Sequence, residues 1–189
     1  MIILASQSPR RRQILADILG DIPFETMPSD FDERQIREKS LSKLCLKEAT
    51  GKALAIAVRH PDDIVIASDT MVEFNHRQIG KPKDRQDAKK TLQMLSGNTH
   101  HILTAYAIYQ GEKCLVSRVI HATLYIEKMA DLEIEEYLDT GSPFDKAGSY
   151  GIQDTDFINS RILEGDKETI MGLPKADLEA DLHDLGIIG

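Results

Sequence analysis

The stretch SQSPRRR at residues 6–12 combines hydroxyl groups, a helix start and three cations. A strand that leads into a helix through a Ser/Pro turn exposes backbone N–H groups at the helix start, where anions bind. Ser8 is a candidate helix cap whose hydroxyl could also donate to a phosphate oxygen. The arginines project about 100° apart around a helix, so at most one or two can reach one ligand. The stretch therefore predicts either a phosphate site or a solvated run of charge.

Two further stretches carry carboxylates at places that suit a divalent cation. Asp69 follows the apolar, β-branched run at residues 63–67, and ligands of α/β proteins bind at the carboxyl ends of such strands. The loop PSDFDER at residues 28–34 contains three more carboxylates. Each stretch has a structural alternative. Asp69 could cap a turn with Thr70, and the loop could be an exposed turn before a helix.

Two loops complete the candidate stretches. In GKPK at residues 80–83, Lys81 lies between glycine and proline, so a rigid backbone would direct its ammonium group; an exposed loop lysine is the alternative. The loop at residues 140–153 ends on Gln153, whose amide offers a donor and an acceptor for a base edge. Together, the cations, carboxylates and amide are suited to a nucleoside polyphosphate and a divalent metal ion.

The elements that position these residues alternate between strands and helices. Proline at a helix start, glycine at its end and apolar periodicity predict helices, and β-branched runs predict strands. We expect strands at 2–6, 22–27 and 63–67, a hairpin over 71–79, an antiparallel ribbon of 101–110 and 113–127, and helices at 9–19, 40–58, 85–95, 132–138 and 177–185. This order indicates an α/β or α+β fold with a mixed sheet.

Composition limits the classes of protein to which the chain can belong. A length of 189 residues fits one domain, or one domain with two lobes. The net charge of −8 argues against binding to nucleic acid polymers or anionic membranes, but not against a local cationic pocket. No apolar run approaches the roughly 20 residues that span a bilayer. Cys45 and Cys114 form no disulfide or metal pattern, so we expect both to be buried and the chain to be cytoplasmic.

Several motifs, in order along the chain, resemble the Maf family of nucleoside triphosphate pyrophosphatases. The resemblance runs from residue 2 to about residue 186. It rests on ASQSPRRRQIL at 5–15, SDFDE at 29–33, Lys52-Ala53, ASDT at 67–70, GKP at 80–82, LSGNTH at 95–100, DKAGSYGIQ at 145–153 and GLP at 172–174. The intact SPRR and KAGSYGIQ stretches resemble the branch acting on dTTP and UTP. The chain departs from the family pattern at Asp154 and at residues 165–169.

The resemblance implies a single domain over residues 1–189. Its fold would be α/β, with a mixed central β-sheet flanked by helices, two lobes and a deep cleft, similar to the inosine triphosphate pyrophosphatases. The implied activity is hydrolysis of dTTP, UTP or a modified pyrimidine nucleotide to the monophosphate and pyrophosphate, with Mg²⁺ or Mn²⁺. A homodimer is expected on the same ground. The alternative is a nucleotide-binding regulator of septum formation with little turnover.

The resemblance also implies roles for individual residues. Asp69 would be the general base or metal-positioning carboxylate, with Glu33 beside it as a metal ligand. The residues that would hold the phosphates are Ser8, Arg11, Lys52 and Lys81. Arg11, Thr70 and Gln153 match positions associated with substrate choice.

Overall fold

The computed structural model describes residues 1–189, except for the side chain of Gln35. Over these residues, seven strands form one hydrogen-bonded sheet: β1 (Ile2–Leu4), β2 (Phe24–Thr26), β3 (Ile64–Phe74), β4 (Arg77–Ile79), β5 (Thr99–Gln110), β6 (Lys113–Ile126) and β7 (Ser160–Glu164). Their order is β2-β1-β3-β5-β6-β7, with β4 paired to β3. The sheet is mixed, because β1 pairs in parallel with β2 and β3, whereas the β3–β4 and β6–β7 pairs are antiparallel.

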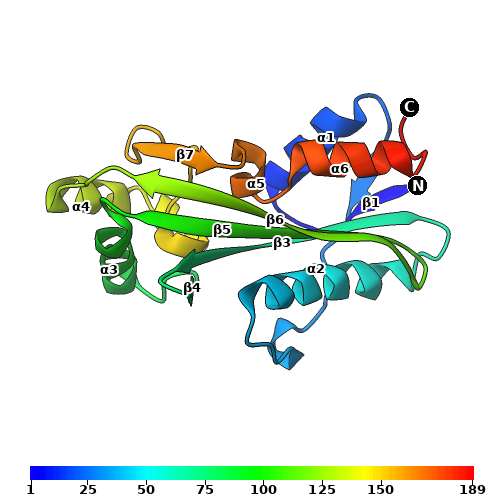
Figure 1. Ribbon diagram of the computed structural model, residues 1–189, viewed down its shortest axis with the longest axis horizontal. Helices are drawn as coiled ribbons and strands as arrows, with labels where there is room; N and C mark the ends of the chain where they lie inside the picture. Colours follow the sequence, from blue (N-terminus) through cyan, green and yellow to red (C-terminus); the bar gives the residue numbers. More distant parts are fainter. The chain divides into compact units, whose positions relative to one another are not determined.

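Helices flank this sheet (Figure 1). They are α1 (Pro9–Leu19), α2 (Leu41–Ala57), α3 (Arg85–Leu95), α4 (Asp131–Asp139), α5 (Lys167–Met171) and α6 (Lys175–Asp184), with short 3₁₀ turns η1 (Glu33–Gln35), η2 (Ser142–Asp145) and η3 (Ala147–Ser149). The predicted α/β class with a mixed central sheet is confirmed. Within the described part of the chain, none of these helices has the length and apolar character that a membrane span requires.

Two compact units share these elements. Unit 1 comprises residues 1–70, 104–120 and 168–189, and unit 2 comprises residues 71–103 and 121–167. The strands β3, β5 and β6 each begin in one unit and end in the other. The single domain and the deep cleft expected from the family resemblance stay predictions.

Serine caps fix the starts of the two long helices of unit 1. The Oγ of Ser8 accepts a hydrogen bond from the backbone N–H of Arg11 at 3.4 Å, and α1 begins at the following proline. Ser40 caps α2 in the same way through its own Oγ. Such caps satisfy backbone donors that the first helical turn leaves free. Both helices are confirmed as predicted.

The two faces of the unit 1 strands pack against different helices, because successive strand residues point to opposite faces. One face packs against α1 and α6 through Ile2, Leu4, Ile66, Tyr106 and Ile108. The other face packs against Ala53, Ile56 and Ala57 of α2 through Ile3, Ala5, Val65, Ala67 and Ala107. Figure 1 shows α1 and α6 on one side of these strands and α2 on the other. This alternation decides which helix each side chain of β3 faces.

The β3–β4 hairpin turns at two residues with left-handed backbone angles. Asn75 and His76 have positive φ angles of 50° and 61°, which is typical of the tight turn that the β3–β4 hairpin uses.

His100 is fully buried, with Nε2 2.6 Å from the hydroxyl of Tyr150, whereas the next residue, His101, is exposed. Burial lowers the pKa of His100 to about 4. This imidazole is therefore neutral in the folded protein near neutral pH.

Acid is expected to destabilise the protein through His100. In the unfolded chain the imidazole takes up a proton below its ordinary pKa of 6.5, whereas in the folded protein it stays neutral down to about pH 4. The unfolded state therefore binds more protons. The free energy of unfolding should fall between these two pH values, by up to about 3 kcal/mol from this group. Urea unfolding across this range measures the effect. His100→Gln should flatten it, and an equal slope in both proteins would contradict a buried neutral imidazole.

The strand that carries Asp69 is longer than the sequence predicts. We expected a strand over residues 63–67 with Asp69 just beyond its end, but β3 runs for 11 residues to Phe74. Residues 72–74 stay extended because they pair with β4, and β5 lies on the other side of β3. The expected place of Asp69 at a strand end is therefore wrong: it lies inside the strand.

Three further differences concern β7, α5 and Cys114. The sequence predicts neither β7, in which four of five residues are exposed, nor the five-residue α5. Both segments are too short to show a clear apolar periodicity, so the sequence gives little indication of this strand and this helix. Cys45 is buried as predicted, but the prediction of a buried Cys114 is wrong, because this residue is exposed near the tip of the β5–β6 hairpin.

Candidate active site

Asp69 lies on the face of β3 that packs against α2. Val65 and Ala67 contact α2, and the period of two along a strand places Asp69 on the same face. Its side chain is only 12% exposed, so its charge requires a partner. Ser68 and Thr70 point to the opposite face, which α1 covers. One strand thus carries a carboxylate on one face and hydroxyl groups on the other.

Three side chains of α2 approach Asp69. Cys45, Glu48 and Lys52 are spaced by three and four residues, which places them on one helix face. The Nζ of Lys52 lies 2.6 Å from Oδ1 of Asp69. The thiol of Cys45 lies 3.4 Å from the backbone oxygen of Asp69 and 3.7 Å from its Oδ2. The helix therefore supplies an ammonium group, a thiol and a second carboxyl group to the same place.

Glu33 reaches this place from the loop before α2. Its Oε1 lies 2.6 Å from Nζ of Lys52. Two residues earlier, the ring of Phe31 lies against α2 at Gly51, where a Cβ atom would be 2.4 Å from Cζ of the ring. Only glycine permits so close an approach. The contact between Gly51 and Phe31 therefore holds the loop that delivers Glu33.

Three carboxyl groups and one ammonium group meet between α2, β3 and η1, all within unit 1. The ligand oxygens of Glu33, Glu48 and Asp69 lie within 4.8 Å of one another, and we call these three residues the carboxylate cluster. Burial alone would lower the pKa of Lys52, but the charges of Asp69 and Glu33 raise it above its ordinary value. Lys52 is therefore a permanent cation in this cluster.

Burial has the opposite effect on the acids that face Asp69. Burial, followed by the charges of Asp69 and Glu33, raises the pKa of Glu48 to about 8. Burial, followed by the charge of Asp69, also raises the pKa of the Cys45 thiol. A nucleophilic cysteine requires a lowered pKa, so Cys45 is unsuited to covalent catalysis. The carboxylates, and not the thiol, are therefore the candidates for catalysis at this site.

The carboxylate cluster has the donor chemistry of a site for a hard divalent cation. Mg²⁺ prefers oxygen ligands at about 2.1 Å, so two ligands on opposite sides of the ion lie about 4.2 Å apart. The oxygens lie within 4.8 Å of one another, so shifts of a few tenths of an ångström in the side chains would bring them to this spacing. In the structure, the ammonium group of Lys52 lies between two of the carboxylates, where it balances part of their charge. A carboxylate at such a place can also orient a water molecule and accept its proton.

Arg11 ties α1 to the opposite face of β3. Its Nε and Nη1 donate to the backbone oxygens of Gly172 and Ser68, both at 2.9 Å, and Nη2 donates to Oγ1 of Thr70 at 3.1 Å. The hydroxyl of Ser68 donates to the same oxygen of Gly172. Arg11 thus contacts both sequence neighbours of Asp69. The guanidinium group has five N–H donors, and these bonds use one on each nitrogen.

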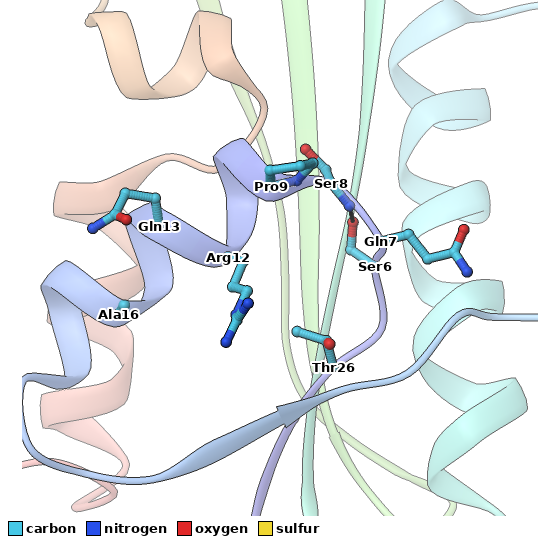
Figure 2. Close-up of a pocket in the computed structure, with 8 residues that line it drawn as sticks. All are labelled: Ser6, Gln7, Ser8, Pro9, Arg12, Gln13, Ala16 and Thr26. Carbon is cyan, nitrogen blue, oxygen red and sulfur yellow. Dashed lines mark hydrogen bonds between the residues drawn. The ribbon is translucent and has the colours of Figure 1, made fainter.

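A cavity of about 560 Å³ lies beside the start of α1. Figure 2 shows its eight lining residues: Ser6, Gln7, Ser8, Pro9, Arg12, Gln13, Ala16 and Thr26. Arg12 extends from α1 into the space toward β2, while Gln7 extends away from it (Figure 2). Arg12 is exposed, whereas Arg10 and Arg11 are both half-buried. The arginines of the SPRRR stretch differ in their contacts, because the Arg11 guanidinium group donates three hydrogen bonds to other elements of the fold.

The other predicted substrate residues belong to unit 2. Lys81 is exposed and lines a second cavity with Lys83 and Lys90. Gln153 is exposed at the end of the loop 140–153, which Gly148 joins to the Lys81 turn through a bond from its N–H to the backbone oxygen of Gly80 at 3.2 Å. Roles for Lys81 and Gln153 toward the same substrate stay predictions.

Asp154, where the chain departs from the family pattern, anchors the loop that carries Gln153. Its Oδ2 accepts bonds from the hydroxyl groups of Tyr137 at 2.6 Å and Ser142 at 2.7 Å. These bonds join the end of the loop to its beginning and to α4. The departure therefore has a structural function within unit 2.

Sequence reasoning missed two residues of the site. Glu48 precedes Lys52 by one helical turn, and this spacing could have drawn attention to it once Lys52 was chosen. Gly172 has a φ of 107°, and a Cβ atom there would lie 3.0 Å from Nε of Arg11. Its backbone oxygen takes part in the Arg11 contacts, and no side chain pattern could have indicated that.

Comparison with known proteins gives one consistent family. The family model described as Maf-like protein matches residues 1–185. A protein of Pyrococcus furiosus named dTTP/UTP pyrophosphatase is 43% identical over 173 residues, which cover 92% of this chain and 89% of the relative. A protein of Bacillus cytotoxicus with the same name is 39% identical over 180 residues, covering 95% and 93%.

A solved structure supports the fold. The HAM1 protein from Coxiella burnetii matches with a TM-score of 0.50 at 15% identity, covering 97% of this chain and 98% of that one. At this identity the likeness concerns the fold alone.

Proposed function

Because the chain belongs to the family of Maf-like proteins, we propose that it hydrolyses a nucleoside triphosphate, dTTP or UTP first, to the monophosphate and pyrophosphate. The observation that carries this proposal is the meeting of Glu33, Lys52 and Asp69. They come from a loop, a helix and a strand, and Nζ of Lys52 lies 2.6 Å from both carboxylates. Three residues so far apart in sequence converge on one point that can orient a water molecule.

The reaction requires water to attack an α-phosphate that carries negative charge. Asp69 would orient the water and accept its proton, and the oxygen would join the α-phosphorus as the bond to the β-phosphate breaks. Cations that face the phosphate oxygens neutralise the charge that otherwise repels the nucleophile. In this proposal, Lys52, Ser8, Lys81 and the remaining N–H groups of Arg11 hold the phosphates. Thr70 and Gln153, together with Arg11, determine which nucleotide is accepted.

The proposal includes a divalent cation, Mg²⁺ or Mn²⁺, with Glu33 and Asp69 as ligands. The spacing of the carboxylate oxygens and their burial beside one ammonium group support this choice. When bound, the ion neutralises charge on the phosphate oxygens and polarises them. A homodimer and a cytoplasmic location are predictions that accompany the proposal.

Gly51→Ala is expected to weaken the cation site although alanine favours helices. The added methyl group would lie 2.4–2.7 Å from three atoms of the Phe31 ring, so the ring and the loop carrying Glu33 must move. We expect the affinity for Mn²⁺ to fall about tenfold, whereas the melting temperature should hold or rise, because alanine stabilises a helix by about 0.5–1 kcal/mol relative to glycine. Electron paramagnetic resonance of free Mn²⁺ measures the affinity. Leu54→Ala, an exposed change on α2, is the control, and equal affinity in both variants would contradict the role of this contact.

A panel of nucleoside triphosphates tests the proposed function. Purified protein with Mg²⁺ or Mn²⁺ should release pyrophosphate from dTTP and UTP faster than from ATP, GTP or CTP. Release from purine nucleotides alone would overturn the substrate class and leave the reaction type in place. No pyrophosphate from any nucleotide, together with measurable binding, would instead favour a nucleotide-binding regulator.

A further inference from the structure

Glu48 is a buried acid without an assigned role. It is 9% exposed and faces Asp69 from the middle of α2. Its carboxyl group hydrogen-bonds that of Asp69. It forms no ion pair with any of the side chains that the structure describes, although Lys52 lies one helical turn away on the same helix. A carboxyl group buried beside two other acids is costly unless a cation balances it.

The charges of the carboxylate cluster are unequal. Glu33 and Asp69 share the single ammonium group of Lys52, each at 2.6 Å, and Glu48 has no such partner. When all three acids act as carboxylate ligands, the cluster carries one positive and three negative charges. A divalent cation would balance this excess, whereas a second monovalent side chain would not.

The geometry suits one ion with three carboxylate ligands. One oxygen from each of Glu33, Glu48 and Asp69 lies within 4.8 Å of the other two, and they come from three separate elements. Ligands that approach from different elements can surround an ion on several sides, as octahedral coordination requires. Neighbouring acids on a single exposed loop could not do this.

We propose that Glu48 is a third carboxylate ligand of the divalent cation, beside Glu33 and Asp69. This inference rests on the cation in the proposed function and extends it to a residue outside the family motifs. The ammonium group of Lys52 already pairs with Glu33 and Asp69, so it would compete with an ion for these two carboxylates. Lys52, if freed from these carboxylates, could direct its ammonium group toward a phosphate.

A purely structural role for Glu48 makes a different prediction. If Glu48 is a neutral acid that only hydrogen-bonds Asp69, then glutamine can replace it, since the side chains have the same shape and the amide donates a hydrogen bond. If Glu48 ligates the ion, glutamine removes a negative charge and the affinity for the ion falls. Glu48→Gln therefore separates the two roles.

The experiment measures binding of Mn²⁺ alone, without nucleotide, by electron paramagnetic resonance. The proteins are the wild type, Glu48→Gln and the control Glu38→Gln, which removes an acid that pairs with Lys47 outside the cluster. Ligand loss should weaken the affinity of Glu48→Gln for Mn²⁺ at least about tenfold, and Glu38→Gln should match the wild type. Thermal unfolding with and without Mn²⁺ gives a second readout, because an ion that binds the folded state raises the melting temperature.

The outcomes distinguish this inference from the proposed function. A weaker affinity and a smaller Mn²⁺-induced melting shift in folded Glu48→Gln support the third ligand. Wild-type affinity in Glu48→Gln, combined with weak binding in Glu33→Gln, would overturn it and leave the two-ligand cation site intact. Equal Mn²⁺ binding in all these variants would overturn both the inference and the cation site. The proposed hydrolysis would then depend only on whether the wild type releases pyrophosphate from the panel of nucleoside triphosphates.

Discussion

Asp69→Asn is expected to abolish pyrophosphate release, with a loss of at least about 10³-fold in kcat. An amide cannot accept the proton of the attacking water, and general-base catalysis contributes about 10²–10⁴-fold. The same change removes a charged ligand of the proposed cation. Nucleotide binding should survive, because the residues proposed to hold the phosphates are unchanged. Release of pyrophosphate by a coupled assay and nucleotide binding by calorimetry measure the two effects.

Asp63, the residue directly before β3, provides a matched control. Asp63 pairs with the N-terminal ammonium group of Met1 at 2.8 Å, away from the carboxylate cluster. Asp63→Asn should retain wild-type kcat. If Asp69→Asn kept full activity, Asp69 would have no part in the mechanism; if Asp63→Asn were equally inactive, the loss would reflect damage to β3.

Lys52→Met is expected to separate metal binding from hydrolysis. Methionine keeps a similar length without the charge, so Glu33 and Asp69 lose their ammonium partner. Hydrolysis should fall at least about 10²-fold, because a cation that faces the phosphates is lost. Binding of Mn²⁺ alone should become tighter, because the ammonium group no longer competes for the carboxylates of Glu33 and Asp69.

The stability of Lys52→Met gives a further check. Removing one partner of a buried ion pair costs about 3–5 kcal/mol, because a charge is left uncompensated. We expect a loss at the lower end, since Glu33 is half exposed. Added Mn²⁺ should restore much of the loss. Lys47→Met, which removes an exposed lysine of the same helix, is the control, and weaker Mn²⁺ binding in Lys52→Met than in this control would contradict competition between the ion and Lys52.

The sequence predicts the elements of this site better than its contacts. Proline, serine and apolar periodicity define α1 and α2, because these signals act within a few residues. The position of Asp69 inside β3 depends on pairing with β4 and β5, and local preference does not reveal such pairing. Glu48 escaped notice for the same reason: only the packing of α2 against β3 shows that it faces Asp69.

Arg11 shows how a motif can indicate the right residue without its contacts. The SPRRR stretch predicts an anion site with one or two useful arginines, and the structure gives the three arginines different surroundings. Arg11 bonds to Ser68 and Thr70, the neighbours of Asp69, and to Gly172. Gly172 lies far away in sequence, so no spacing rule could reveal that the motif also supports the strand that carries the carboxylate.

In the proposed reaction, water attacks the α-phosphate of a nucleoside triphosphate. Hydrolysis of dTTP in H₂¹⁸O with Mg²⁺, followed by mass spectrometry of the products, tests it most directly. Attack at the α-phosphorus places one ¹⁸O atom in the thymidine monophosphate and none in the pyrophosphate. Label in the pyrophosphate, or release of orthophosphate with thymidine diphosphate, would contradict it.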